Sequence, residues 1–192
     1  MRRSSRFFRS AALALTILIA GAGAAEAQSS RPAGMGKTSN NSENADRGMV
    51  KVAFGDKSVS IDYGRPQLKG RDMLAMAPDG FIWRFGSNTS TTIESSADVM
   101  FGTKKLAMGK YSTWLKHITG DQWALVFNSE TGMWGDPGAK RENDILEISL
   151  SYTKGGKEVE RFTVDIMDHG NKIGHMLITW GTHRLETSFK TN

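Results

Sequence analysis

Leu146-Glu147-Ile148-Ser149-Leu150-Ser151-Tyr152 is a strict alternation of apolar and polar residues. Because successive side chains of a β-strand point to opposite faces of a sheet, this pattern predicts a strand with one buried face. The same alternation returns at residues 162–166 and 176–180. Gly155-Gly156 separates the first two of these runs and predicts a hairpin turn between them.

Further strand patterns lie on the N-terminal side of this stretch. Residues 59–63 alternate in the same way, and residues 111–115 and 123–127 are rich in β-branched, aromatic and other apolar side chains. Gly120-Asp121 lies between the last two runs and predicts a second hairpin. The spacing of strands and turns is typical of an all-β domain.

Helical patterns are nearly absent from the same region. One helical turn is possible at residues 72–77, which Pro78 would end. Residues 49–192 therefore predict roughly ten strands in a single antiparallel β-sandwich of jelly-roll type. An up-and-down barrel is the alternative.

The first 27 residues have the layout of a secretory signal peptide. Four arginines precede an apolar run at residues 11–20, and the small residues Ala25 and Ala27 follow it. We expect cleavage after Ala27, with Ala24 as the alternative position. The apolar run is shorter than the roughly 20 residues of a transmembrane helix, so no membrane span is expected after cleavage.

Residues 28–48 are rich in Ser, Asn, Gly and charged side chains, which predicts a flexible linker ahead of the domain. The chain has no cysteine, so disulfides and thiolate metal sites are excluded. Export without disulfides favours a bacterial periplasmic or secreted protein.

The net charge of +5 comes mostly from the N-terminal segments. From Met49 to Asn192 the chain has 18 Lys and Arg against 17 Asp and Glu, a net charge of +1. A nearly neutral domain has little long-range field to attract phosphates or anionic lipid. Neither nucleic acid nor a membrane surface is expected as a partner.

The most distinctive motifs lie between residues 61 and 91. They read Ile61-Asp62-Tyr63-Gly64-Arg65-Pro66, Lys69-Gly70-Arg71 and Trp83-Arg84-Phe85-Gly86-Ser87-Asn88. In this order they resemble the exported bacterial family known as domain of unknown function 2911 (DUF2911). The resemblance implies an exported, β-rich fold and nothing about a substrate. Where the family carries an acidic residue after the asparagine, this chain has Thr89, which counts against a catalytic role.

Arg65 is the first candidate for ligand binding in these motifs. In a strand it shares a face with Tyr63, so its side chain could point inward. It could present its planar fork to an anionic ligand, or it could pair internally with Asp62, Asp72 or Asp98. Internal pairing is the favoured interpretation, because most buried charges are paired.

Three more candidates are charged or polar residues near turns. Lys69 and Arg71 belong to a polar loop that contains glycine, where binding residues often lie, although a solvated turn is the favoured interpretation. Trp83 and Arg84 should face opposite ways, with Trp83 in the core. Asn88 could orient a ligand or only satisfy loop backbone groups.

Trp114 and Trp134 are the two tryptophans that could form an exposed aromatic platform for a sugar; the simpler interpretation is that they cover the ends of the sandwich. The four histidines show no close metal-ligand spacing, although His175 and His183 could approach each other across a hairpin. We expect no metal and no cofactor.

The resulting hypothesis is an exported, non-catalytic domain that binds a small molecule, a glycan or a protein. Its ligand-binding candidates are Tyr63, Arg65, Lys69, Arg71, Arg84, Asn88 and Trp134. The alternative is an envelope hydrolase or isomerase that uses Arg84, Asn88 and a histidine from the C-terminal strands. A structural role through sheet edges is a third possibility.

Overall fold

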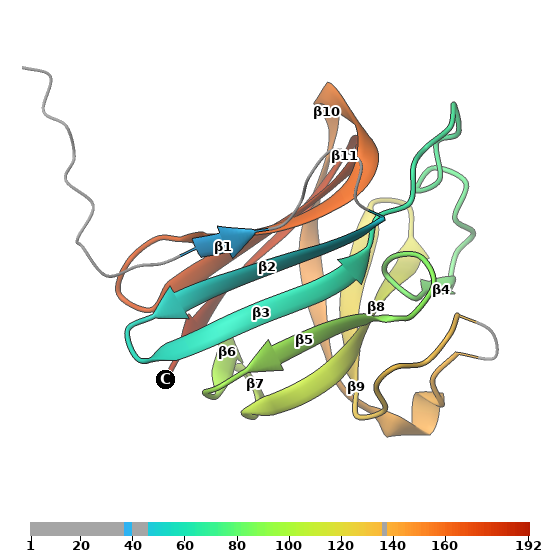
Figure 1. The fold of residues 1–192 in the computed structure, drawn as a ribbon. Helices are drawn as coiled ribbons and strands as arrows, with labels where there is room; N and C mark the ends of the chain where they lie inside the picture. The colour runs from blue at the N-terminus through green and yellow to red at the C-terminus, as the bar shows by residue number, and fades with distance from the viewer. Residues whose placement is uncertain (1–36, 40–45, 136–137) are drawn as a thin grey trace, which may run out of the picture. The chain divides into compact units, whose positions relative to one another are not determined.

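A computed structural model describes residues 37–39, 46–135 and 138–192, which consist largely of antiparallel β-strands (Figure 1). Ten strands follow the order β1-β2-β3-β5-β8-β9-β10-β11-β6-β7 in one sheet, and β4 pairs with β8 outside that order. The strands are β1 (Lys37–Ser39), β2 (Arg47–Phe54), β3 (Lys57–Gly64), β4 (Ile82–Trp83), β5 (Thr91–Ser95), β6 (Val99–Phe101), β7 (Lys104–Leu106), β8 (Gly109–Thr119), β9 (Gln122–Asn128), β10 (Asp144–Asp168) and β11 (Ile173–Thr191).

The prediction of an all-β domain with roughly ten strands is confirmed. The finer prediction of a jelly-roll sandwich is not shown, because these strands belong to one continuous sheet. The alternative of a closed barrel is wrong, since β1 and β7 stand at the two ends of an order that does not close. In the described part of the chain, one short 3-10 helix, η1 (Arg141–Asn143), precedes β10.

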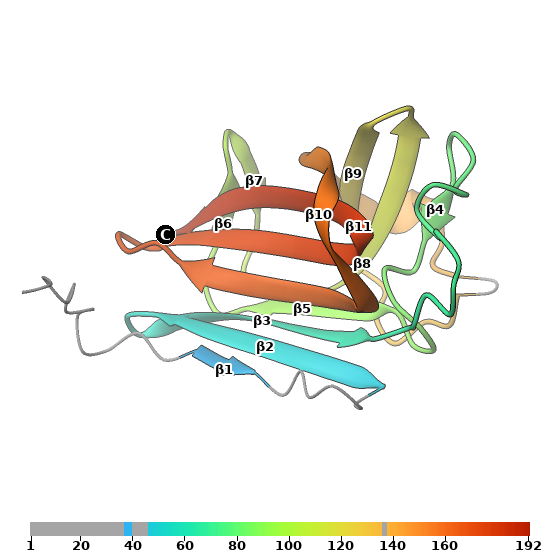
Figure 2. The ribbon, with the colours of Figure 1, turned by 90° about the horizontal axis from the view of Figure 1, so that it is seen from above.

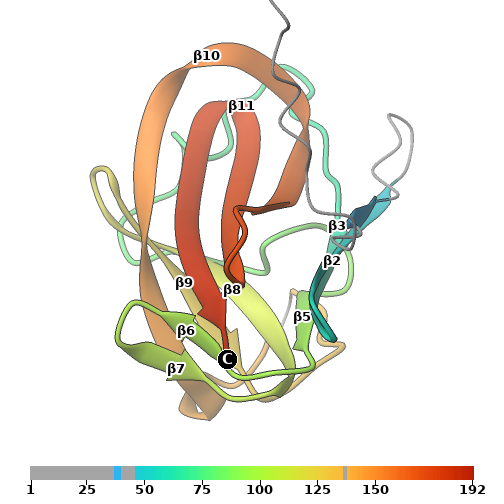
Figure 3. The same ribbon diagram turned by 90° about the vertical axis from the view of Figure 1, so that its left-hand side faces the viewer.

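The predicted hairpin at Gly155-Gly156 is wrong, because both glycines lie inside the single strand β10. Ser151 pairs with Glu186 before the glycines and Thr163 pairs with Thr179 after them, so both halves of β10 lie antiparallel to β11. The two glycines have φ angles of 125° and 94°, which side chains disfavour, and the pairing shifts register across them, between Lys154 and Val159. They bend a long strand instead of reversing it (Figures 1 and 3).

This bend allows one strand, β10, to pair first with β9 and then with β11. Residues 144–150 of β10 pair with β9, and the residues after them pair with β11 (Figure 2). The predicted hairpin at Gly120-Asp121 is confirmed, since Thr119 pairs with Gln122 where β8 turns into β9.

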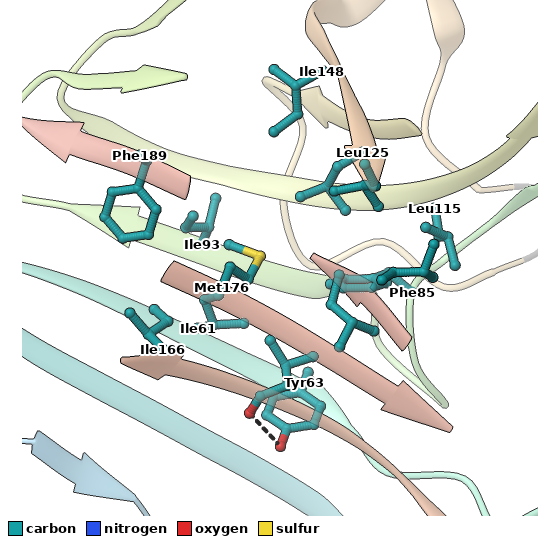
Figure 4. Packing of buried hydrophobic residues seen from close by; sticks show 14 of the residues in the cluster. Ile61, Tyr63, Phe85, Ile93, Leu115, Leu125, Ile148, Ile166, Met176 and Phe189 are labelled. Atoms are coloured by element: carbon teal, nitrogen blue, oxygen red, sulfur yellow. Dashed lines mark hydrogen bonds between the residues drawn. The ribbon is translucent and has the colours of Figure 1, made fainter. Parts of the chain in front are cut away.

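The core lies between β10–β11 and the strands around β3. Tyr63 of β3 is fully buried, and its hydroxyl donates a hydrogen bond of 3.0 Å to the carbonyl of Val164 in β10 (Figure 4). Phe162 is also fully buried, with its ring 5.1 Å from that of Trp83 and 5.7 Å from that of Trp180. Strands from both ends of the sequence therefore share one aromatic cluster.

The first described strands lie within the expected linker and at its end. β2 starts at Arg47, two residues before Met49, and residues 37–39 of the expected linker form β1, which pairs with β2. The expected signal peptide and the rest of the expected linker up to residue 45 lie outside the described residues. In the ranges that the structure describes, no helix has the length and hydropathy to cross a membrane.

Phe162→Ala should lower the free energy of unfolding by about 3 to 5 kcal/mol, because it leaves a cavity among four aromatic rings. Urea denaturation followed by tryptophan fluorescence measures the change. The control is Phe81→Ala at a side chain that is 45% exposed, where a change within about 0.5 kcal/mol is expected. Equal losses for both variants would contradict this account of the core.

Candidate functional site

The seven candidate residues fall into two groups and one core position. Tyr63 is core, as described above, and is not accessible to a ligand. Arg65, Lys69 and Arg71 lie beside β10, where Leu68 donates its backbone N–H to the Glu160 carbonyl. The second group is Arg84, Asn88 and Trp134. Arg84 lies against Gly135 in the segment that follows β9, and Trp134 of that segment pairs with Thr89, the neighbour of Asn88.

In the first group, Arg65 is 6% exposed and its Nη2 lies 3.5 Å from the hydroxyl of Thr163. The three carboxylates considered as its partners have contacts elsewhere: Asp62 pairs with Arg47, Asp72 with Lys154 and His183, and Asp98 with Lys105. Lys69 and Arg71 are exposed loop residues, and Arg71 Nε donates to the carbonyl of Leu68 at 3.4 Å. The first group therefore belongs to a loop whose backbone is hydrogen-bonded to Glu160 of β10.

Arg84 follows the two-residue strand β4 and lies on the opposite side from Trp83. The indole of Trp83 stacks on that of Trp180, with ring centroids 5.2 Å apart and planes 12° apart. Trp83 is partly buried and packs against the main core, on the side where it was expected. Arg84 instead lies against Gly135, where an added Cβ would collide with the guanidinium group. This contact explains why position 135 carries no side chain.

The segments 129–135 and 138–143 cover the outer face of β8 and β9. Asn128 fastens them, since its amide donates to the Lys140 carbonyl at 2.8 Å and accepts from the Glu130 N–H at 2.8 Å. Beneath them is a second small core, separate from the main one. Its members are Trp114, Val126 and Ala139, with Ile82 and Met133 packed against them.

Trp114 is therefore not an exposed platform. It is 3% exposed, and its indole N–H donates to the hydroxyl of Ser112 at 2.9 Å. Trp134 differs, because it is 62% exposed while its backbone pairs with Thr89. Only Trp134 of these two offers an aromatic surface to solvent.

Three buried polar atoms in this region have no hydrogen-bond partner among the described residues. They are Nε of Arg84, the hydroxyl of Ser90 and the hydroxyl of Thr113 in β8. Ser90 is fully buried and its backbone N–H donates to the Met133 carbonyl at 2.7 Å, so it lies next to the covering segment. Leaving a buried donor without an acceptor costs roughly 1 to 3 kcal/mol, and more for a charged group.

The backbone beside Arg84 is also strained. Phe85 is fully buried with a φ of 54°, and Asn88 has a φ of 62°. A bulky residue at positive φ is a genuine outlier that costs of order 1 to 3 kcal/mol. The hydroxyl of Thr91 holds this conformation by donating to the Phe85 carbonyl at 2.5 Å. Sequence reasoning found Arg84 and Asn88 but not Ser90, because a lone serine carries no pattern.

Gly64, at the end of β3, allows the segment of residues 85–88 to approach this strand closely. A Cβ at Gly64 would collide with the backbone of Ser87, and one at Gly86 would lie 2.9 Å from the Gly64 carbonyl. The two glycines thus allow direct backbone contact. We call Arg84, Asn88, Ser90 and Trp134, with Gly135, the Arg84 site.

The family model described as "Protein of unknown function (DUF2911)" matches residues 45–189. The chain belongs to the DUF2911 family. No curated protein and no solved structure matches it. The DUF2911 match includes all seven candidate residues and both groups into which they fall.

The histidines of this DUF2911 domain do not gather at the Arg84 site. His175 pairs with Glu186 at 2.8 Å, and His183 lies between Asp72 at 2.5 Å and the hydroxyl of Tyr152 at 2.8 Å. His175 and His183 were expected to approach each other, but the hydrogen bonds of each are with other residues. In the ranges that the structure covers, no three His, Asp or Glu side chains form a group that could hold a metal ion.

His117 makes an unusual set of contacts at the turn between β8 and β9. Its Nδ1 lies 2.8 Å from the Ala77 carbonyl, and its Nε2 lies 2.8 Å from the Gly120 carbonyl. Both ring nitrogens face acceptors, so both can donate only when the ring is protonated. Burial lowers the pKa of His117, but the carbonyls of Gly120, Pro78 and Ala77 and the nearby Asp79 carboxylate together raise it above its ordinary value.

This raised pKa gives a pH dependence to stability. The contribution of protonated His117 is fully present below its unfolded pKa of about 6.5 and is lost as the pH rises through the folded-state pKa. The difference in unfolding free energy between the wild-type protein and His117→Gln should therefore shrink between pH 6 and pH 9. Urea denaturation at each pH measures it. A difference that stays constant or grows would show that His117 is neutral in the folded domain.

Proposed function

We propose that this domain is an exported ligand-binding protein whose Arg84 site takes a small anionic ligand and does no chemistry of its own. Export rests on the signal-peptide pattern of residues 1–27. The observation that carries the binding proposal is the buried Nε of Arg84, which has no hydrogen-bond partner among the described residues. A carboxylate or phosphate would supply the missing acceptor with bidentate geometry.

Two further features support a ligand at this place. Trp134 precedes Gly135, against which Arg84 lies, and Asn88 precedes Thr89, which pairs with Trp134. Both side chains are exposed, and an amide with an aromatic ring is suited to orient an organic anion. The strained backbone at Phe85 is the kind of feature that clusters at binding sites. The first group also has a residue at positive φ, Lys69 at 50°, but its backbone is bonded to β10, and its members Arg65, Lys69 and Arg71 offer no amide or aromatic side chain.

The hydrolase or isomerase alternative gains no support at this site. Its histidine was expected from the C-terminal strands, but the ring nitrogens of His175 and His183 make their hydrogen bonds with Ser188, Glu186, Asp72 and Tyr152. The Arg84 site offers a cation, an amide, an indole and one hydroxyl, which suit binding and provide no general base near neutral pH.

The binding proposal predicts that citrate or inorganic phosphate raises the melting temperature of the mature protein. A ligand at about 100 times its Kd stabilises by about 2.7 kcal/mol, which corresponds to a rise of roughly 5 to 10 °C for a domain of this size. Arg84→Gln should abolish the rise, because the planar donor fork is lost. Comparison of citrate with phosphate shows which acid group the site prefers.

The matched control is Arg71→Gln, which removes an exposed arginine of the first group and should leave the rise intact. Asp136 follows Gly135 in the sequence and lies outside the described residues, so Asp136→Asn tests whether Arg84 has an internal partner instead. If no anion shifts the melting temperature, and Asp136→Asn destabilises the protein as much as Arg84→Gln does, the proposal is wrong.

A further inference from the structure

We propose that Tyr152 is a nucleophile, activated by His183 and Asp72, that takes an acyl group from a carboxylic ester. This second site is separate from the Arg84 site and does not depend on it. The hydroxyl of Tyr152 lies 2.8 Å from Nδ1 of His183, and Nε2 of His183 lies 2.5 Å from Oδ1 of Asp72. A hydroxyl, a histidine and an orienting carboxylate in this order form the arrangement of an activated nucleophile.

The hydrogen bonds determine the direction in which the proton can move. Burial alone raises the pKa of Asp72, but hydrogen bonds from the Ala75 N–H, His183 and Lys154 hold it below its usual value. Asp72 is therefore an ionised acceptor, and Nε2 of His183 must carry a hydrogen. In neutral His183 the other nitrogen, Nδ1, is then an acceptor. The Tyr152 hydroxyl donates to it, as a nucleophile donates to its general base.

The surroundings bury the base and leave the tyrosine partly exposed. The side chain of His183 is 2% exposed, so its ring is fixed, whereas Tyr152 is only partly buried. Burial, as the largest cause, raises the pKa of Tyr152, so the phenol stays protonated near neutral pH. Its reactivity then depends on transfer of the proton to His183.

The sequence spaces these residues too widely for any motif to reveal them. Asp72 belongs to the loop after β3, while Tyr152 and His183 belong to β10 and β11. Lys154 of β10 also contacts Asp72, with its Nζ 3.2 Å from Oδ2. The antiparallel pairing of Tyr152 with Leu185 and of Lys154 with His183 brings them together.

The chemical step is balanced by the groups present. The Tyr152 oxygen forms a bond to the ester carbonyl carbon, and its proton moves to Nδ1 of His183. The bond from the carbonyl carbon to the alcohol oxygen then breaks, and His183 returns the proton to the departing alcohol. The products are an acyl-tyrosine and the free alcohol, and Asp72 stabilises the imidazolium that forms between the two transfers.

The test uses the mature full-length protein with two probes, p-nitrophenyl acetate and phenylmethanesulfonyl fluoride. Peptide mass mapping measures the rate of acetylation or sulfonylation at each of the three tyrosines. Tyr111 is the internal control, because it is also partly buried but donates to the Ala107 carbonyl at 3.1 Å and has no base. Tyr152 should react at least about 100 times faster than Tyr111, the lower range of general base catalysis.

Two variants separate activation from mere exposure. His183→Asn should reduce labelling of Tyr152 to the rate of Tyr111, and Asp72→Asn at a 44% exposed side chain should reduce it without removing a buried ring. Thermal denaturation verifies that each variant folds. Equal labelling of Tyr152 and Tyr111 in the wild-type protein, or unchanged labelling of Tyr152 in a folded Asp72→Asn variant, would overturn the proposal.

Discussion

The stacking of Trp83 on Trp180 is the contact on which the arrangement of this domain depends. Strand β4 has two residues and, among the described strands, pairs with β8 alone, so its pairing gives it little stability. Trp83 joins it to β11, and Phe162 of β10 packs edge-on against both indoles. Because neighbouring side chains point in opposite directions, burial of Trp83 directs Arg84 to the outer face. The core therefore determines where the cation lies.

Two glycines, Gly135 and Gly64, allow the close contacts around Arg84 and around the segment that follows it. Gly135 leaves room for the guanidinium, and Gly64 allows the backbone of Ser87 to approach β3 closely. The covering segment then buries Nε of Arg84 without supplying an acceptor among the described residues. An arginine held in this way is complementary to an anion that arrives from solvent, because the cost of desolvation has already been met by folding.

The strand pattern and the β8–β9 hairpin could be predicted from the sequence because they depend on local periodicity and turn chemistry. The role of Gly155-Gly156 could not, since two glycines at positive φ can end a strand or bend it, and only the pairing of both halves with β11 decides. The opposite directions of the Trp83 and Arg84 side chains could also be predicted, because neighbouring residues of an extended chain point to opposite faces. Ser90 and the contact of Tyr152 with His183 could not be foreseen, because they depend on which distant segments meet.

The most direct test of the central claim is a crystal structure of the mature protein grown at neutral pH with citrate. The account predicts electron density for a carboxylate within hydrogen-bond distance of Nε of Arg84, with Trp134 and Asn88 beside the anion and Trp83 stacked on Trp180. An Arg84 side chain that forms an ion pair with Asp136, with no anion bound, would contradict it.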